Sequence, residues 1–135
     1  MIKITPAHRA LFFEFLRFGV VGVIGFLVDN AVVYGTKGLI GVYWAGALAY
    51  PVASTGNWFL NRIWTFKGAS SDALHVQWLR FLAVNLIGFV FNRGTYFALV
   101  ASFPFVEGHP VIAVAAGSIA GMFFNFFLSR RLVFR

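Results

Sequence analysis

Two ionisable side chains, Asp29 and Arg93, lie in the middle of long apolar runs, where a charge is expensive. Asp29 follows Arg17 by 12 residues and Arg93 follows Arg80 by 13, about 18 and 19 Å along a helix. Both depths pass the midpoint of a hydrocarbon core about 30 Å thick, where ionisable residues indicate function. One interpretation is a structural ion pair. The other is a guanidinium that binds a phosphate in transit, with Asp29 as its resting counter-ion, and the two are compatible.

Asparagines stand near the ends of two apolar runs, in the segments NWFLNRIWTF (57–66) and NFFLSRRLVF (125–134). Asn57 and Asn61 are four residues apart and share one helix face. Amides near the head groups can hydrogen-bond a sugar or a phosphate without the cost of burying a charge, so Asn57, Asn61 and Asn125 are candidate ligand contacts. The alternative is that these side chains only bridge helices, which contributes about 1 kcal/mol. Asn85 is interpreted as such a bridge.

Arginines flank the same runs and form a predicted basic ring on one side of the membrane. Most of this ring is explained by topology and lipid anchoring, and Arg17 and Arg80 are the members expected to gather a phosphate head group. The ring consists of Arg17, Arg62, Arg80, Arg130 and Arg131. The chain has no phosphate-binding loop, no H-E-x-x-H and no paired nucleophile. We therefore expect no enzyme, no cofactor and no metal site.

Composition identifies the class of protein to which these residues belong. Of 135 residues, 60% are hydrophobic and only 11% are charged, whereas soluble domains carry about 25% charged residues. The sequence predicts an all-α integral membrane protein. Its net charge of +7 points to a phospholipid or lipid-phosphate head group rather than to nucleic acid, because the basic residues adjoin apolar runs.

Four segments are long enough to cross a membrane as helices, at about 20 apolar residues each. They are expected at residues 18–36, 42–61, 80–102 and 110–129, with breaks at the glycines of 35–41 and at Pro104, Gly108 and Pro110. Basic residues crowd the termini and the central loop, while the opposite loops offer only Lys37. The positive-inside rule then places both termini in the cytoplasm.

The second half of the chain repeats the first. The triplet LRF at 16–18 recurs 63 residues later at 79–81, and Asn57 recurs 68 residues later as Asn125. The fold class predicted is therefore four transmembrane helices built from two parallel two-helix repeats, about 15–67 and about 78–135. Transporters often bind substrate between such repeats. The alternative is that duplication only built a stable bundle.

The segments FLRFGVVGVIGFLVDN, NWFLNRIWTF, LRFLAVNLIGFVFNR and NFFLSRRLVF resemble the GtrA-like family, and the resemblance covers the chain from about Phe15 to Phe134. It implies a small four-span protein of the bacterial cytoplasmic membrane that moves polyprenyl-phosphate-linked sugars. It also implies a cytoplasmic-side glycosyltransferase partner that loads the sugar. The second copy departs from the motif, because Ser129 stands at the position of Asn61.

The sequence thus predicts one transmembrane domain over 1–135 that flips a polyprenyl-phosphate-linked monosaccharide without ATP. Four helices are few to enclose a polar path for the phosphosugar, so we expect a homo-oligomer whose copies complete that path. Two alternatives stay open: a non-transporting scaffold or regulator of a glycosyltransferase, and a small multidrug-type cation exporter that uses Asp29. The sugar, the lipid length, the oligomer number and the driving force are not defined by the sequence.

Overall fold

The computed structural model describes residues 3–68 and 72–134, and this part of the chain is helical without any strand. Four long helices are accompanied by one short helix and by two π-helical turns, labelled η. The elements are α1 (Pro6–Ile40), α2 (Val42–Leu60), η1 (Asn61–Thr65), α3 (Leu74–Ser102), α4 (Pro104–Gly108), α5 (Pro110–Leu128) and η2 (Ser129–Val133). The expected all-α architecture is confirmed.

The first helix is longer than the sequence suggests at both ends. Thr5 caps its start, where the hydroxyl accepts the backbone N–H of His8 at 3.2 Å. Gly35 and Gly38 do not break it, because a glycine inside a helix only weakens it by about 1 kcal/mol. The helix ends where Gly41 turns to a φ of +84°, a backbone conformation that favours glycine.

Three helical segments are long and apolar enough to cross a membrane: Pro6–Ile40, Leu74–Ser102 and Val111–Val133. The fourth expected span, α2, has 19 residues, or about 28 Å of helix. It does not belong to that group, and tyrosines, a proline, a serine, a threonine and an asparagine lower its hydropathy. The chain is therefore a multi-pass membrane protein, and the fourth span stays a prediction.

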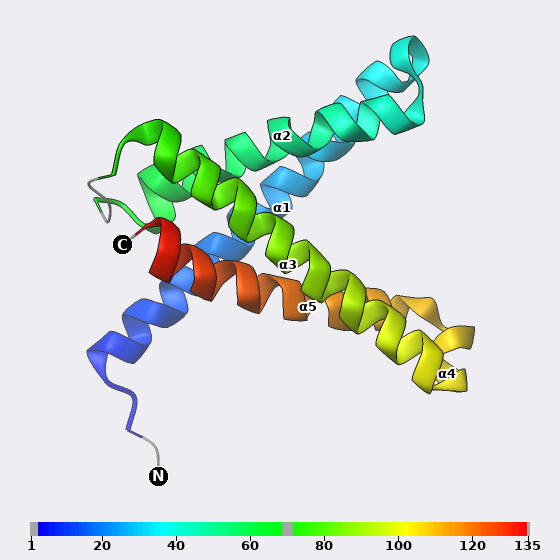
Figure 1. The fold of residues 1–135 in the computed structure, drawn as a ribbon. Helices are drawn as coiled ribbons and strands as arrows, with labels where there is room; N and C mark the ends of the chain where they lie inside the picture. Colours follow the sequence, from blue (N-terminus) through cyan, green and yellow to red (C-terminus); the bar gives the residue numbers. More distant parts are fainter. Residues whose placement is uncertain (1–2, 69–71, 135) are drawn as a thin grey trace.

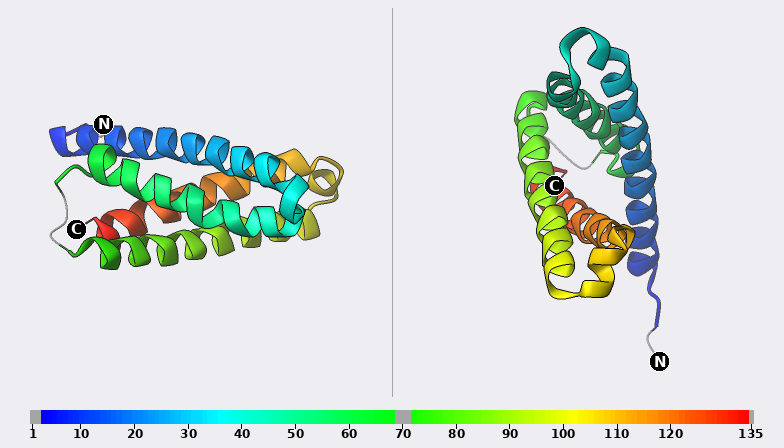
Figure 2. Two further views of the ribbon diagram at one scale, coloured as in Figure 1. Left: turned by 90° about the horizontal axis from the view of Figure 1, so that it is seen from above. Right: turned by 90° about the vertical axis from the view of Figure 1, so that its right-hand side faces the viewer.

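The long helices form two antiparallel hairpins. Helix α1 packs along α2, and α3 packs along α5, as Figures 1 and 2 show. Both chain termini lie at the end of the bundle where α2 ends and α3 begins, which we call the terminal end (Figure 1). The hairpins meet there and diverge toward the opposite end, which we call the hairpin end (Figure 1).

Aromatic rings hold the two hairpins together at the terminal end. Phe66 and Phe134 stack with ring centroids 4.8 Å apart and an interplanar angle of 17°. Each ring directly follows a π-helical turn, whose last hydrogen bond runs from the N–H of Phe66 or Phe134 to the carbonyl of Asn61 or Ser129, at 2.8 and 2.9 Å. The stack joins a buried aromatic core formed by Phe18, Phe66, Phe81, Phe126 and Phe134.

Within the second hairpin, glycines let α5 approach the backbone of α3. A Cβ added at Gly117 would lie 2.6 Å from the carbonyl oxygen of Asn92, and one added at Gly121 would lie 3.0 Å from the Cβ of Asn92. Close backbone approach at small residues is a common basis of helix association in membranes. Substitution at these glycines must therefore push the helices apart.

We expect Gly117→Ala to lower the free energy of unfolding by about 1–3 kcal/mol, because the added methyl group overlaps a backbone carbonyl that cannot rotate away. Gly94→Ala on α3 is the matched control, since nothing lies within 4 Å of a Cβ there. Thermal unfolding in detergent measures both variants. Equal unfolding midpoints for the two would contradict the close α3–α5 packing.

Candidate functional site

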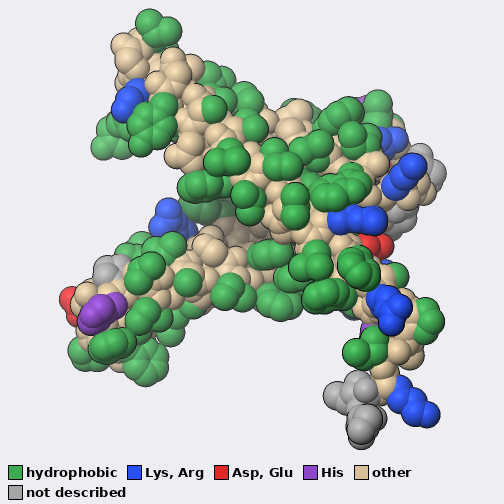
Figure 3. All heavy atoms as spheres, turned by 180° about the vertical axis from the view of Figure 1, so that it is seen from behind, with side chains coloured by type: hydrophobic (Ala, Val, Ile, Leu, Met, Phe, Trp, Pro, Cys, Tyr) green, Lys and Arg blue, Asp and Glu red, His purple; other side chains and the backbone are tan. Residues whose placement is uncertain are grey.

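A cavity of about 540 Å³ lies between the two hairpins. Residues of α1, α2, η1, α3 and α5 line it. Figure 3 shows the molecule from behind, hollowed between its two diverging arms. Phe18 and Phe81 of the aromatic core belong to its lining, so the cavity adjoins that core.

The lining of this cavity is uncharged and combines an apolar surface with a group of polar side chains. It contains five asparagines, together with the hydroxyl groups of Tyr50, Ser54 and Ser118. None of the lining residues within the described chain is charged. The asparagines are Asn57, Asn61, Asn85, Asn92 and Asn125. Neutral amides and hydroxyls both donate and accept hydrogen bonds, so this surface suits a polyhydroxylated, uncharged group.

Glycines on the partner helix of each hairpin position two of these amides. A methyl group at Gly25 would overlap the amide of Asn57, and one at Gly88 would overlap the amide of Asn125. Each amide thus lies in the space that a side chain on the facing helix would fill. The two contacts are alike in the two hairpins.

Three of the amides have carbonyl oxygens that are buried without a donor. The Oδ1 atoms of Asn57, Asn61 and Asn125 have no hydrogen-bond partner among residues 3–68 and 72–134. Asn61 is only 1% exposed. A buried acceptor without a donor costs about 1–3 kcal/mol, so each of these three oxygens retains an unused capacity to accept a hydrogen bond.

Asp29 and Arg93 do not pair in this structure. The ion pairs of the described residues are Arg80–Asp72 and Arg130–Glu14. Neither Asp29 nor Arg93 lines the cavity. Arg93 is exposed, and its guanidinium carbon lies 5.5 Å from the ring centroid of Phe89, a lining residue. Arg93 therefore lies beside one lining residue without lining the cavity itself, while the structure gives Asp29 no contact with it.

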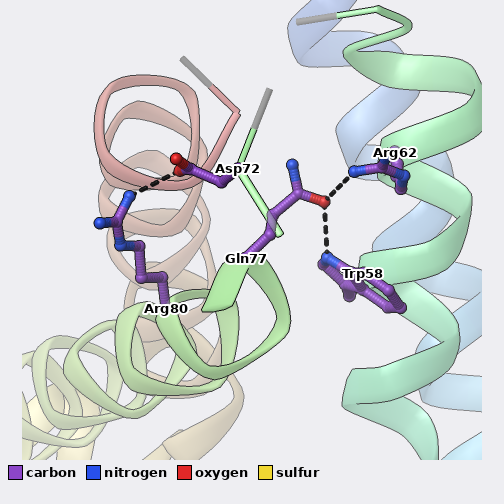
Figure 4. Close-up of polar contacts among 5 residues, drawn as sticks. All are labelled: Trp58, Arg62, Asp72, Gln77 and Arg80. Carbon is purple, nitrogen blue, oxygen red and sulfur yellow. Dashed lines mark hydrogen bonds and ion pairs between the residues drawn. The ribbon is translucent and has the colours of Figure 1, made fainter. Parts of the chain in front are cut away.

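The predicted basic ring is found at the terminal end, where Arg17, Arg62, Arg80 and Arg130 contact other side chains and no member lines this cavity. Arg17 lies over the ring of Trp64, 5.9 Å from its centroid. Three arginines bind oxygen atoms: Arg62 to Oε1 of Gln77 at 2.7 Å, Arg80 to Asp72 at 2.7 Å and Arg130 to Glu14 at 2.9 Å. Figure 4 shows the first two of these three contacts. A substrate role for these arginines stays a prediction.

Sequence reasoning missed two cavity asparagines. Asn85, interpreted as a helix bridge, lines the cavity while its Nδ2 donates to the carbonyl of Phe81 at 3.0 Å. Asn92 is not among the candidate ligand contacts that the sequence suggests, yet it lines the cavity. The signal was present, because Asn85, Gly88 and Asn92 are spaced by three and four residues, which places them on one helix face.

The fold and the cavity define an all-α, multi-pass membrane protein with an amide-lined site between two helical hairpins. The chain belongs to the GtrA/DPMS transmembrane-domain family: the family model described as "GtrA/DPMS, transmembrane domain" matches residues 17–134. The predicted resemblance to GtrA-like proteins is confirmed. Comparison with curated proteins gave no match.

We expect Asn61→Leu to raise the free energy of unfolding by about 1 kcal/mol, because a similarly sized apolar group replaces a buried acceptor without a donor. Asn85→Leu is the control, since it removes a hydrogen-bonded amide from the same cavity. Thermal unfolding in detergent compares the two. A lower midpoint for Asn61→Leu than for wild type would show that Asn61 is satisfied by an internal donor.

Proposed function

We propose that this protein is an ATP-independent translocase for a polyprenyl-phosphate-linked monosaccharide. The observation that carries the proposal is the convergence of five asparagines on one cavity between the hairpins. Membership of the GtrA/DPMS family supports it. The polyprenyl tail stays in the lipid, and the sugar passes through the amide-lined cavity.

The chemistry of the cavity favours a neutral sugar as the group that passes. Sugar hydroxyls donate hydrogen bonds to the unpaired oxygens of Asn57, Asn61 and Asn125. They also accept from the amide nitrogens, because a hydroxyl does both. Several such bonds offset the loss of hydration as the sugar leaves water. Asn57, Asn61 and Asn125 are thus the proposed sugar contacts.

We further propose that all four long helices span the bacterial cytoplasmic membrane as two parallel repeats with both termini in the cytoplasm. Several features support this. The hairpins carry matching π-helical turns and matching asparagine–glycine contacts. The described basic residues other than Lys37 and Arg93 lie at the terminal end, as the positive-inside rule requires of a cytoplasmic face.

Arg93 is the proposed phosphate ligand at the edge of the cavity. Its exposed guanidinium has no carboxylate partner among the described residues, and such a fork binds a phosphate through two parallel hydrogen bonds. The phosphate is bonded directly to the sugar, so a sugar in the cavity brings the phosphate to its edge. Asp29, one turn beyond the lining residue Phe26, does not pair with Arg93 in this structure, and its role as a resting counter-ion stays a prediction.

Homo-oligomerisation and a cytoplasmic-side glycosyltransferase complete the proposal. Large apolar side chains are exposed over both arms, including Phe26 at 67% and Phe97 at 63%. Lipid covers such surfaces in a monomer and a second copy covers part of them in an oligomer. The loaded lipid is the product of a glycosyl transfer, so an enzyme that makes it must work in the same leaflet.

The cavity weighs against the two alternatives. A cation exporter needs a carboxylate in its path, and the lining residues of the described chain include none. A pure scaffold needs no polar cavity, and buried acceptors without donors would only destabilise it. A translocase for a neutral sugar accounts both for the lining without a carboxylate and for the buried acceptors without donors.

Asn61→Leu should slow translocation at least tenfold while the protein stays folded. The assay uses liposomes with a short-chain polyprenyl-phosphate hexose and follows its arrival in the opposite leaflet. Ser129→Ala is the matched control, because it removes a buried polar atom without a partner that does not line the cavity. Equal rates for Asn61→Leu and wild type would contradict a sugar path through the cavity, and no acceleration by folded wild type would favour the scaffold.

Arg93→Ala should reduce translocation at least tenfold and change the free energy of unfolding by less than about 0.5 kcal/mol, as expected of an exposed side chain without an ion pair. Arg93→Lys keeps the charge but not the planar fork, so an intermediate rate is expected. Transport and thermal unfolding are measured on the same preparations. Loss of folding in Arg93→Ala would instead support the structural ion pair with Asp29.

A further inference from the structure

A second cavity, of about 270 Å³, lies at the terminal end. Its lining combines two cations, an amide and two rings of the aromatic core: Arg62, Lys67, Gln77, Phe66 and Phe134, with Ile63 and Gly68. The stacked pair Phe66–Phe134 belongs to this cavity, whereas Phe18 and Phe81 belong to the first. Ring centroids 6.2 Å apart for Phe18–Phe66 and 5.9 Å apart for Phe81–Phe134 show that aromatic side chains separate the two spaces.

Gln77 presents a buried donor to the second cavity. Its Oε1 accepts from Nε1 of Trp58 at 3.0 Å and from Nη1 of Arg62 at 2.7 Å. These two donors fix the amide orientation, because only the oxygen can accept. Gln77 is 0% exposed, and its Nε2 has no partner among the described residues. Figure 4 shows this nitrogen pointing away from both donors.

The charges around that donor are positive. Arg62 and Lys67 line the cavity, and no carboxylate does so within the described chain. The nearby carboxylate of Asp72 binds Arg80 at 2.7 Å on the other side of Gln77 (Figure 4). Arg62 donates one hydrogen bond to Gln77, and a guanidinium has five N–H donors. The cavity thus offers three kinds of donor to an acceptor-rich anion.

We propose that this second cavity binds the phosphate group of a lipid phosphate, through Arg62, Lys67 and Nε2 of Gln77. A phosphate matches the site because it is anionic and its oxygens accept hydrogen bonds from cationic donors. An attached lipid chain is favoured over free phosphate, because Ile63 lines the cavity and is 50% exposed, with Trp64 beside it 42% exposed. An apolar chain can lie against both.

This site is distinct from the amide-lined cavity, and the proposal stands whether or not that cavity passes a sugar. The two spaces nevertheless share one turn of the chain. Asn61 lines the first cavity and the adjacent Arg62 lines the second, both within η1. An anion bound by Arg62 therefore acts directly on the turn that carries Asn61.

The test is a binding titration of the purified full chain in detergent, by calorimetry, with farnesyl phosphate as the probe. Farnesol is the uncharged control, and inorganic phosphate is the competitor without a lipid chain. Lys67→Gln is the main variant, because Lys67 is exposed and its replacement leaves the core untouched. Arg131→Gln is the matched control, since Arg131 is an exposed cation at the same end that does not line the cavity.

We expect saturable binding of farnesyl phosphate, none of farnesol, and a loss of affinity of about tenfold in Lys67→Gln with no change in Arg131→Gln. Gln77→Leu should weaken binding by a similar factor, and Gln77→Glu should weaken it more because a carboxylate repels phosphate. Competition by millimolar inorganic phosphate would support the phosphate site but assign its ligand to a free anion.

Two results would overturn the proposal. Equal weakening in Lys67→Gln and Arg131→Gln would reduce the effect to general attraction between a basic surface and an anion. Binding of farnesol as tight as that of farnesyl phosphate would reduce it to contact with the lipid chain. If Gln77→Leu does not fold, Lys67→Gln and Arg131→Gln still decide the question, because both residues are exposed.

Discussion

The packing of an asparagine amide against a glycine is the contact on which both hairpins depend. Asn57 occupies the space over Gly25, and Asn125 occupies the space over Gly88, where a methyl group would overlap the amide. The contact brings the helices of each hairpin together, and it sets the amides beside the space between the hairpins, where both line the cavity. A larger residue at either glycine would displace the amide, so helix packing and cavity lining cannot be varied independently. The buried, unpaired oxygens are the cost of this arrangement, and under the proposed function a ligand with donors offsets it.

The π-helical turns join the two hairpins at the terminal end only. A wider turn at Asn61–Thr65 and another at Ser129–Val133 direct Phe66 and Phe134 into a stack between the hairpins. Such turns are rare and occur often at functional sites. The hairpins are joined there and diverge toward the hairpin end (Figure 1). The aromatic stack separates the amide-lined cavity from the basic one, so it is the layer that a group passing between them would have to displace.

The sequence was most informative where a residue type carries its own constraint. Apolar length, the missing charges and the asparagine-arginine endings predicted an all-α membrane protein and three of the five cavity asparagines. Helix ends were predicted less well: breaks were expected at Gly35, Gly38 and Gly41, and of these three glycines only Gly41 adopts a positive φ and ends the helix. The spacing of Asn85 and Asn92 places them on one helix face, but which space that face meets depends on how the second hairpin crosses the first. The contact of Arg62 with Gln77 likewise joins η1 to α3 across the bundle.

Under the proposed function, the separation of charge from amides follows from the free energy of moving a sugar phosphate through lipid. A charged group deep in the membrane costs at least about 2.5 kcal/mol, and a permanent cation inside the cavity would hold a phosphate too tightly to release it. Neutral amides bind hydroxyls without either penalty, so the five asparagines can form the central part of the path. Cations are useful where the head group is captured and where it leaves, and Arg62 and Lys67 at one end and Arg93 at the edge of the cavity fit these two places. Under the proposed function, the amides lower the barrier and the cations set where the phosphate rests on either side of it.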